Sequence, residues 1–213
     1  MAAAPRAIGM SSDDPRDRSL TGPLGQALHA VARALAVLPI PGMIIGGIAV
    51  IARGVPRLTR DVDATVAVGA LGISELLDHL HRHDLEPRID DAIGFATANQ
   101  VLLLRHAPSG IDIDLSLAWL PFELDALAAA ETVDIGGVSV RVARPEDLVV
   151  YKAVAFRPQD QQDIERLLTL HASEIDLDRV RRIVQEFADA LDEPERPEEL
   201  QRIIQRAGGL RDG

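Results

Sequence analysis

Residues 46–63 read GGIAVIARGVPRLTRDVD, so a glycine pair is followed by a short apolar segment and then by two aspartates that lie two positions apart. The apolar residues 43–45 stand directly before the glycines, which predicts a strand, a glycine turn and a short helix over 48–53. In 61–68 a valine or alanine recurs at every second position, the period of a strand with one buried face. The local order is therefore strand, turn, helix and strand.

Further elements are predicted on either side from the spacing of apolar residues. Helical spacing covers 23–38 and 73–80, while strand patterns cover 101–104, 111–117 and the hairpin 133–142. At Pro145, a proline followed by acidic residues favours a helix start, and helices dominate the rest of the chain. They are predicted over 146–156, 159–171, 178–191 and 198–207.

These elements predict an α/β protein of the α+β type, in which a core with a small mixed β-sheet is followed by a helical C-terminal half. The predicted divisions are a flexible leader over 1–22, the core over 23–144 and a helical region over 145–213 that packs on the core. A chain of 213 residues is long enough for one domain with a modest appendage.

The composition is that of a folded globular protein, with 47% hydrophobic and 26% charged residues. The apolar runs are shorter than the roughly 18 residues that a membrane-spanning helix needs, and the first residues lack the pattern of a signal peptide. We therefore expect a soluble, cytoplasmic protein with no membrane partner. Cysteine is absent, which excludes thiolate nucleophiles, and a formal net charge of −11 gives no general electrostatic footprint for nucleic acid.

Four aspartates on two predicted strands are candidates for a metal site. Asp61 and Asp63 leave the same face of one strand, because side chains two apart on a strand point the same way, and Asp112 and Asp114 repeat this arrangement. Like charges about 4 Å apart cost on the order of 4 kcal/mol at an effective dielectric constant near 20, so converging carboxylates need a cation or a proton. Such oxygen ligands suit Mg²⁺, and a pair of these ions can clamp the attacking and leaving oxygens of a phosphoryl transfer.

The glycine pair is a candidate phosphate-binding turn. Gly46 and Gly47 have no side chains, so backbone N–H groups can approach a phosphate chain closely. The pair itself contains no Ser or Thr, so a side-chain hydroxyl is missing at that point. Each feature alone has a simpler explanation, since a glycine pair can be only a turn and alternating aspartates only a solvated face. Their combination favours a single phosphoryl-transfer site.

At these residues the sequence resembles the nucleotidyltransferase superfamily of the DNA polymerase β type. Within that superfamily it is most similar to the AbiEii or MenT-like toxin nucleotidyltransferases. The resemblance covers about residues 40–170 and depends on two segments. The first comprises Gly46, Gly47, Ala49, Gly54, Arg57, Thr59, Asp61 and Asp63, with Asp114 on the later strand, and the second comprises Pro145, Glu146, Asp147, Leu148, Lys152, Ala155, Arg157, Asp160, Asp163 and Ile164.

The resemblance implies a nucleotide site with bound metal. Asp61, Asp63 and Asp114 would hold two Mg²⁺ ions, with Mn²⁺ as an alternative metal, and would form the catalytic carboxylate set. Gly46 and Gly47 would line the phosphate pocket. The nucleotidyltransferase core of the family therefore corresponds to the predicted α+β core.

The same resemblance assigns further residues to the nucleotide. Lys152 would meet the triphosphate, and it is the only lysine among 22 basic residues, which makes it stand out in a chain that otherwise uses arginine. Asp163 would belong to the active site, with a helix-surface or arginine-paired carboxylate as the alternative. Arg57 and Thr59 would contact the nucleotide, although Arg57 is as well suited to pair with a strand aspartate.

Two functions follow as hypotheses. The first is a Mg²⁺-dependent nucleotidyltransferase that moves a nucleoside monophosphate from a nucleoside triphosphate to a hydroxyl of tRNA or of a protein, releases pyrophosphate and has a cognate antitoxin as partner. The second is a non-catalytic nucleotide-sensing or partner-binding module that keeps the fold. Asp112 competes with Asp114 as the third carboxylate, and the family pattern alone favours Asp114. The acidic charge argues against RNA as the acceptor.

Overall fold

The computed structural model describes residues 22–69 and 71–209. Except for Gly22, the predicted leader lies outside the described residues. The chain forms two compact units. The first comprises the described residues up to Ala52 together with Pro56–Ala143, and the second comprises Arg53–Val55 together with the chain from Arg144 on.

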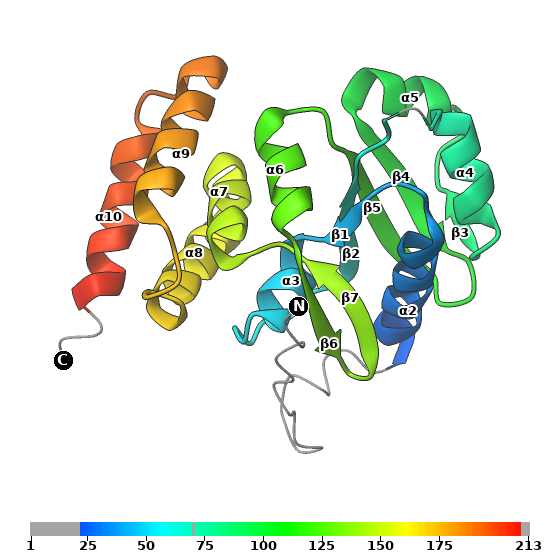
Figure 1. Ribbon diagram of the computed structural model, residues 1–213, viewed down its shortest axis with the longest axis horizontal. Coiled ribbons are helices and arrows are strands. Elements are labelled where there is room, and N and C mark those ends of the chain that lie inside the picture. The colour runs from blue at the N-terminus through cyan, green and yellow to red at the C-terminus, as the bar shows by residue number, and fades with distance from the viewer. Residues whose placement is uncertain (1–21, 70, 210–213) are drawn as a thin grey trace, which may run out of the picture. The chain divides into compact units, whose positions relative to one another are not determined.

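The first unit is built around a mixed sheet of seven strands (Figure 1). In spatial order the strands run β3-β4-β5-β2-β1-β7-β6. Their bounds are β1 Gly42–Ile44, β2 Asp61–Val66, β3 Leu85–Pro87, β4 Val101–His106, β5 Ile111–Leu117, β6 Glu131–Ile135 and β7 Val138–Val142. The predicted mixed sheet is therefore confirmed, and β2 and β5 lie in its middle, where both have a strand on either side.

Strand pairing in the middle of the sheet brings distant segments of sequence together. β2 runs antiparallel to β1 and parallel to β5. The parallel pairing aligns Val62 with Ile113, and both side chains are almost fully buried on one face of the sheet. Because side chains alternate along a strand, their neighbours in β2 and β5 point to the opposite face. This alternation is the period of two from which both strands were predicted.

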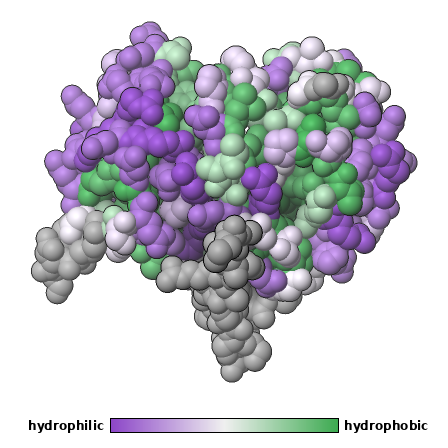
Figure 2. Space-filling model, in the orientation of Figure 1, coloured by the Kyte–Doolittle hydropathy of each residue, from purple (hydrophilic) through white to green (hydrophobic). Residues whose placement is uncertain are grey.

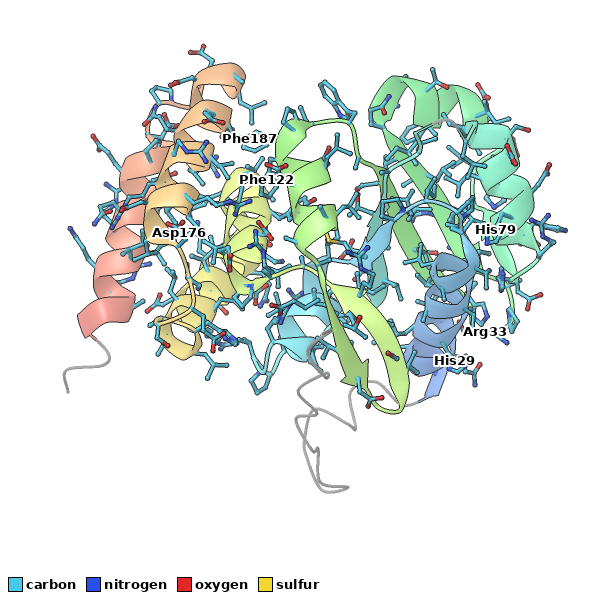
Figure 3. All side chains as sticks on the ribbon, viewed as in Figure 1. His29, Arg33, His79, Phe122, Asp176 and Phe187 are labelled. Carbon is cyan, nitrogen blue, oxygen red and sulfur yellow. The ribbon has the colours of Figure 1, made fainter. Side chains whose placement is uncertain are left out.

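The described part of the first unit has five helices that flank the sheet: α2 Gly22–Val37, α3 Gly46–Ala52, α4 Ile73–His81, α5 Ala92–Asn99 and α6 Pro121–Ala129. The long α2 buries apolar side chains such as Leu28 and Val31 and packs against β1, β2, β5 and β7. His79 of α4, labelled in Figure 3, makes a hydrogen bond of 3.0 Å with the Ala34 carbonyl of α2. The helix predicted over 48–53 begins earlier, so that the glycine pair forms its first residues.

The second unit contains four helices in its described part, close to their predicted positions: α7 Pro145–Ala155, α8 Pro158–Leu170, α9 Leu177–Leu191 and α10 Arg196–Gly209. α7 packs against both α8 and α9, and α10 packs against α8 and α9. In α9 the apolar side chains Val180, Ile183 and Val184 are buried, while Arg181, Arg182 and Glu186 are among its exposed residues. The face of α9 and α10 seen in Figure 2 is accordingly mainly hydrophilic.

Three elements of the first unit were not predicted from sequence: β3, α5 and α6. β3 has only three residues, too few for a period of two to be recognised. α5 reads AIGFATAN and α6 reads PFELDALAA, and both carry apolar residues around most of the helix rather than along one stripe. None of the described helices is long and apolar enough to cross a membrane.

Candidate active site

The carboxylates of β2 and β5 lie side by side because the two strands are parallel and in register. Asp61 is aligned with Asp112, and Asp63 with Asp114. All four side chains leave the sheet on the face opposite Val62 and its buried neighbours. Two acidic pairs that are about 50 residues apart in sequence therefore form one acidic cluster on the sheet.

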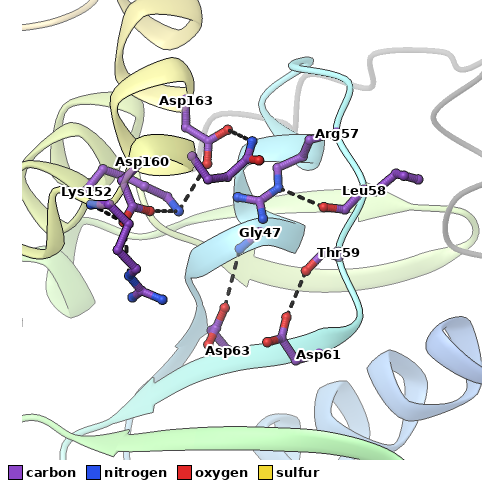
Figure 4. A network of polar contacts seen from close by, with 11 residues as sticks. Gly47, Arg57, Leu58, Thr59, Asp61, Asp63, Lys152, Asp160 and Asp163 are labelled. Carbon is purple, nitrogen blue, oxygen red and sulfur yellow. Dashed lines mark hydrogen bonds and ion pairs between the residues drawn. The ribbon is translucent and has the colours of Figure 1, made fainter.

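Gly46 brings the chain directly over this cluster. Its backbone has a φ of +61°, which side-chain-bearing residues rarely adopt, and a Cβ atom built there would fall 1.9 Å from an Asp63 carboxylate oxygen. The Gly47 N–H donates to the same carboxylate, at 3.4 Å between nitrogen and Oδ2 (Figure 4). Only a glycine at position 46 lets the turn and the carboxylate approach this closely.

The loop before β2 supplies a hydroxyl and a cation beside the glycine pair. A Cβ atom on Gly47 would lie 2.5 Å from the Thr59 hydroxyl oxygen and 3.2 Å from the guanidinium carbon of Arg57. The Thr59 hydroxyl donates to Asp61 at 2.8 Å (Figure 4). The hydroxyl that the glycine pair itself lacks is thus present beside the turn, supplied by a residue twelve positions after Gly47.

Two arginines that the sequence did not indicate hold the aspartates of β5. Arg88, which follows β3, donates to Asp112 at 3.1 Å and to Asp114 through its other terminal nitrogen. Arg105 of β4 donates to Asp112 at 2.8 Å. Arg88 lies 24 and 26 positions before its partners, and Arg105 faces Asp112 across the turn between β4 and β5. Because both contacts join different elements, no spacing within a single element reveals them.

Their positions make the two aspartates electrostatically different. The hydrogen bond from Arg105, assisted by the charges of Arg105 and Arg88, holds the pKa of Asp112 below its usual value. Burial raises the pKa of Asp114, and the nearby negative charges of Asp61 and Asp112 add to this rise against the opposing effect of Arg88. Asp112 is therefore a charge-compensated carboxylate, whereas Asp114 is the one that a further cation would stabilise most.

The chemistry of these donors suits a hard divalent cation. Asp61, Asp63 and Asp114 offer only oxygen ligands. Because Gly46 has no side chain, it does not cover the Asp63 carboxylate that lies beside it. Within residues 22–69 and 71–209, however, no three acidic or histidine side chains already stand in a metal-binding group. Metal binding would thus require some of these carboxylates to turn toward a common point.

Lys152 and Asp163, which the resemblance assigns to the site, lie in the second unit. The Lys152 ammonium contacts Asp160 at 2.7 Å and Asp163 at 3.1 Å (Figure 4). These side chains are buried, with Asp163 fully inaccessible to solvent. Asp160 also accepts the backbone N–H of Arg157 at 3.1 Å and so caps the start of α8.

A second buried ion-pair network begins α7. Asp147 is fully buried and accepts hydrogen bonds from Arg144 at 2.9 Å and from Arg179 at 2.7 Å. Glu146 pairs with Arg144 at 3.1 Å. In this unit the segment Pro145–Leu148, which contributed to the family resemblance, therefore fixes the entry into α7 and its packing on α9.

The close approach at Gly46 leads to a testable expectation. Gly46→Ala should destabilise the protein by about 1–2 kcal/mol, because alanine is strained at a positive φ, and it should also displace the Asp63 carboxylate. Gly110→Ala is a matched control, because Gly110 has a φ of +72° and nothing within 4 Å of an added Cβ. Both variants should lose stability in urea, Gly46→Ala more than Gly110→Ala because its Cβ also meets the Asp63 side chain, and only Gly46→Ala should weaken binding of Mn²⁺ measured by electron paramagnetic resonance. Equal Mn²⁺ binding in both variants would contradict the assignment of the Gly46 turn to the metal site.

Comparisons with known proteins bear on the fold and the family. Residues 25–205 match a protein-family model described as "Nucleotidyl transferase of unknown function (DUF2204)". No functionally curated protein matches the chain significantly.

Solved structures with a similar fold are only distantly related in sequence. The crystal structure of ANT(2'')-Ia in complex with adenylyl-2''-tobramycin has 19% identity and a TM-score of 0.52, covering 78% of this chain and 97% of that one. The solution structure of the antibiotic-resistance factor ANT(2'')-Ia has 20% identity and a TM-score of 0.50, with coverages of 78% and 91%. An antigenic nucleotidyltransferase-like protein from Paracoccidioides brasiliensis has 20% identity and a TM-score of 0.49, with coverages of 83% and 91%. The two ANT(2'')-Ia structures show that the chain has a nucleotidyltransferase fold.

Proposed function

The chain belongs to the family of nucleotidyl transferases of unknown function (DUF2204), and we propose that it is a Mg²⁺-dependent enzyme that transfers a nucleoside monophosphate from a nucleoside triphosphate to an acceptor hydroxyl. The observation that carries this proposal is the acidic cluster itself. Asp63 and Asp114 are neighbours in register on parallel strands, and the glycine turn lies directly over Asp63. The family and the fold support nucleotidyl transfer in general, and the acidic cluster supports the metal dependence.

In this proposal the residues of the first unit bind the metal ion and the phosphates of the nucleotide. Asp61, Asp63 and Asp114 would hold Mg²⁺, which supplies positive charge to neutralise the triphosphate and the charge that develops in the transition state. The side-chain-free turn at Gly46 leaves room for phosphate oxygens beside the carboxylates. Arg57 places its guanidinium next to the turn, where it suits a phosphate.

The reaction exchanges the phosphoanhydride bond between the α- and β-phosphates of the nucleotide for a phosphoester bond to the acceptor. The acceptor oxygen attacks the α-phosphorus and forms a new phosphoester bond, while the bond between the α-phosphorus and the bridging oxygen of the β-phosphate breaks. Pyrophosphate leaves with the electron pair, and the proton of the acceptor hydroxyl passes to a base or to water. In this scheme the residues of the site position the nucleotide and help to neutralise its negative charge, and they form no covalent intermediate with it.

For Lys152 we propose a contact with the triphosphate. An ammonium group has three N–H donors, and the contacts with Asp160 and Asp163 engage two of them. The third remains for a phosphate oxygen, and the two carboxylates fix the direction in which it points. Asp163 acts in this scheme as a positioning residue for Lys152.

The acceptor is proposed to be a hydroxyl of a protein or of a small molecule rather than of tRNA. Binding to RNA depends on neutralising phosphates with basic side chains, and the chain has a formal net charge of −11. A protein acceptor agrees with the toxin-like resemblance, in which a cognate antitoxin is the expected partner. The ANT(2'')-Ia structure with adenylyl-2''-tobramycin makes aminoglycosides a reasonable small-molecule class to test.

Transfer from labelled nucleotides tests this function. The purified protein is incubated with each of the four [α-³²P]nucleoside triphosphates and Mg²⁺, and with total tRNA, a cell protein extract or an aminoglycoside mixture as acceptor. We expect label to move from one preferred nucleotide into the protein or aminoglycoside fraction, with equimolar release of pyrophosphate and complete loss of transfer in EDTA.

Two results would argue against the proposal. Metal-independent nucleotide binding without any transfer would favour the non-catalytic sensing module instead. Label found mainly in tRNA would keep the nucleotidyltransferase activity but overturn the proposed acceptor class.

A further inference from the structure

We propose that Arg88 is a positioning residue that competes with the divalent cation for Asp114. In the free protein its guanidinium bridges Asp112 and Asp114, and it releases Asp114 when the metal binds while remaining on Asp112. This inference relies on the metal site of the proposed function. It explains how an acidic cluster is kept stable before the metal and nucleotide arrive.

The contacts of Arg88 show a shared rather than a dedicated ion pair. One terminal nitrogen donates to Asp112 at 3.1 Å and the other donates to Asp114, so the planar group spans both carboxylates. In the described part of the chain, its Nε is buried and has no hydrogen-bond partner. Buried polar atoms in proteins usually have a hydrogen-bond partner, so the unpaired Nε leaves Arg88 less than fully stabilised in this position.

The backbone of Arg88 is paired with the sheet, which limits how far its side chain can retreat. Its backbone N–H donates to the Leu103 carbonyl of β4 at 3.0 Å, so the residue continues the pairing of β3 with β4. The backbone can therefore remain fixed while the side chain rotates. Such a side-chain movement is fast and needs no rearrangement of the strands.

Arg105 makes the release of Asp114 possible without leaving Asp112 uncompensated. It donates to Asp112 at 2.8 Å from the adjacent strand β4. When a cation replaces Arg88 at Asp114, Asp112 still has a dedicated partner in Arg105 and can keep one nitrogen of Arg88. Within the described residues, Asp114 contacts Arg88 but no second arginine. It is therefore the carboxylate that becomes available to a metal ion.

The different partners of Asp112 and Asp114 also separate their roles. Asp112 anchors two arginines, and Asp114 is left as the third metal ligand beside Asp61 and Asp63. The choice between these two aspartates, which the family pattern alone decided in favour of Asp114, thereby receives support from the contacts in this chain.

Metal binding to the nucleotide-free protein provides the test. Mn²⁺ affinity is measured by electron paramagnetic resonance for the wild type, Arg88→Gln and Arg105→Gln. We expect Arg88→Gln to bind Mn²⁺ roughly tenfold more tightly, because the metal no longer has to displace a charge-assisted hydrogen bond from Asp114. Arg105→Gln removes the same charge from the same cluster but no contact with Asp114, so its affinity should stay within about twofold of wild type.

Further variants make the outcome decisive. Arg88→Lys keeps the charge but loses the planar fork that spans two carboxylates, so its Mn²⁺ affinity should lie between those of the wild type and Arg88→Gln. This variant also serves if Arg88→Gln does not fold. Equal affinity of the wild type and both Arg88 variants would overturn the inference, as would equal gains in Arg88→Gln and Arg105→Gln, because the effect would then be one of charge alone.

Asp63→Asn separates this failure from a failure of the proposed function. If the wild type binds Mn²⁺ and Asp63→Asn does not, the metal site stands whatever the Arg88 variants do. If neither protein binds Mn²⁺ and no Arg88 variant restores binding, the metal-dependent function itself is overturned, and the inference about Arg88 with it.

Discussion

Asp63→Asn is expected to lower the rate of nucleotidyl transfer by about a thousandfold while leaving the protein folded. Asp63 lies in register with Asp114 and directly beneath Gly46, so its carboxylate stands between the two parts of the proposed site. Asparagine has nearly the same shape and can still accept the Gly47 N–H, but it removes the negative charge that a metal ion needs. The measurement is single-turnover transfer from a labelled nucleotide at saturating Mg²⁺, with thermal unfolding as the check on folding.

Asp78→Asn provides the matched control. Asp78 lies exposed on α4 of the same unit, so its replacement changes the net charge by the same amount away from the acidic cluster. We expect transfer by this variant to stay within about twofold of wild type. Similar losses in the two variants would show that net charge, and not the position of Asp63, governs the activity.

Lys152→Met is expected to reduce the free energy of unfolding by about 3–5 kcal/mol. The substitution leaves Asp160 and Asp163 buried without the ammonium group that both contact, and an uncompensated buried charge is one of the most destabilising changes in a protein. Urea denaturation followed by circular dichroism measures the change. Activity of this variant is informative only under conditions where the protein remains folded.

The exposed pair of Arg182 and Glu186 on α9 supplies the comparison for this prediction. The two side chains are 2.9 Å apart but largely exposed, so Arg182→Met should cost no more than about 0.5 kcal/mol. Lys152→Arg keeps the charge and should retain more stability than Lys152→Met. If Lys152→Met unfolds at the same urea concentration as Arg182→Met, the buried cluster does not stabilise the second unit.

The parts of the site that were predictable from sequence are those encoded in local periodicity. The alternation around Asp61 and Asp63, and again around Asp112 and Asp114, correctly indicated two strands with an acidic face. Periodicity does not state which strands become neighbours, and the parallel register of β2 with β5 depends on how the whole sheet assembles. That the aspartates of the two strands lie close together was therefore a hypothesis, which could be tested only once the order of the strands in the sheet was known.

Residues that act across strands escaped the sequence interpretation for the same physical reason. Arg88 follows a strand too short to be recognised, and its partners lie 24 and 26 positions later. Thr59 was assigned to the nucleotide only by resemblance, and its position beside Gly47 depends on a loop whose path has no periodic pattern. Side chains that converge from different elements become visible only when the sheet order is known.

The short strand β3 has a consequence for how the protein behaves at high concentration. β3 is the outermost strand beside β4, and it ends at Pro87, which has no N–H to offer a further strand. An edge of three residues that closes with a proline is a poor template for pairing with the sheet of another molecule. The segment that delivers Arg88 to the acidic cluster thus also protects this side of the sheet against intermolecular β-aggregation.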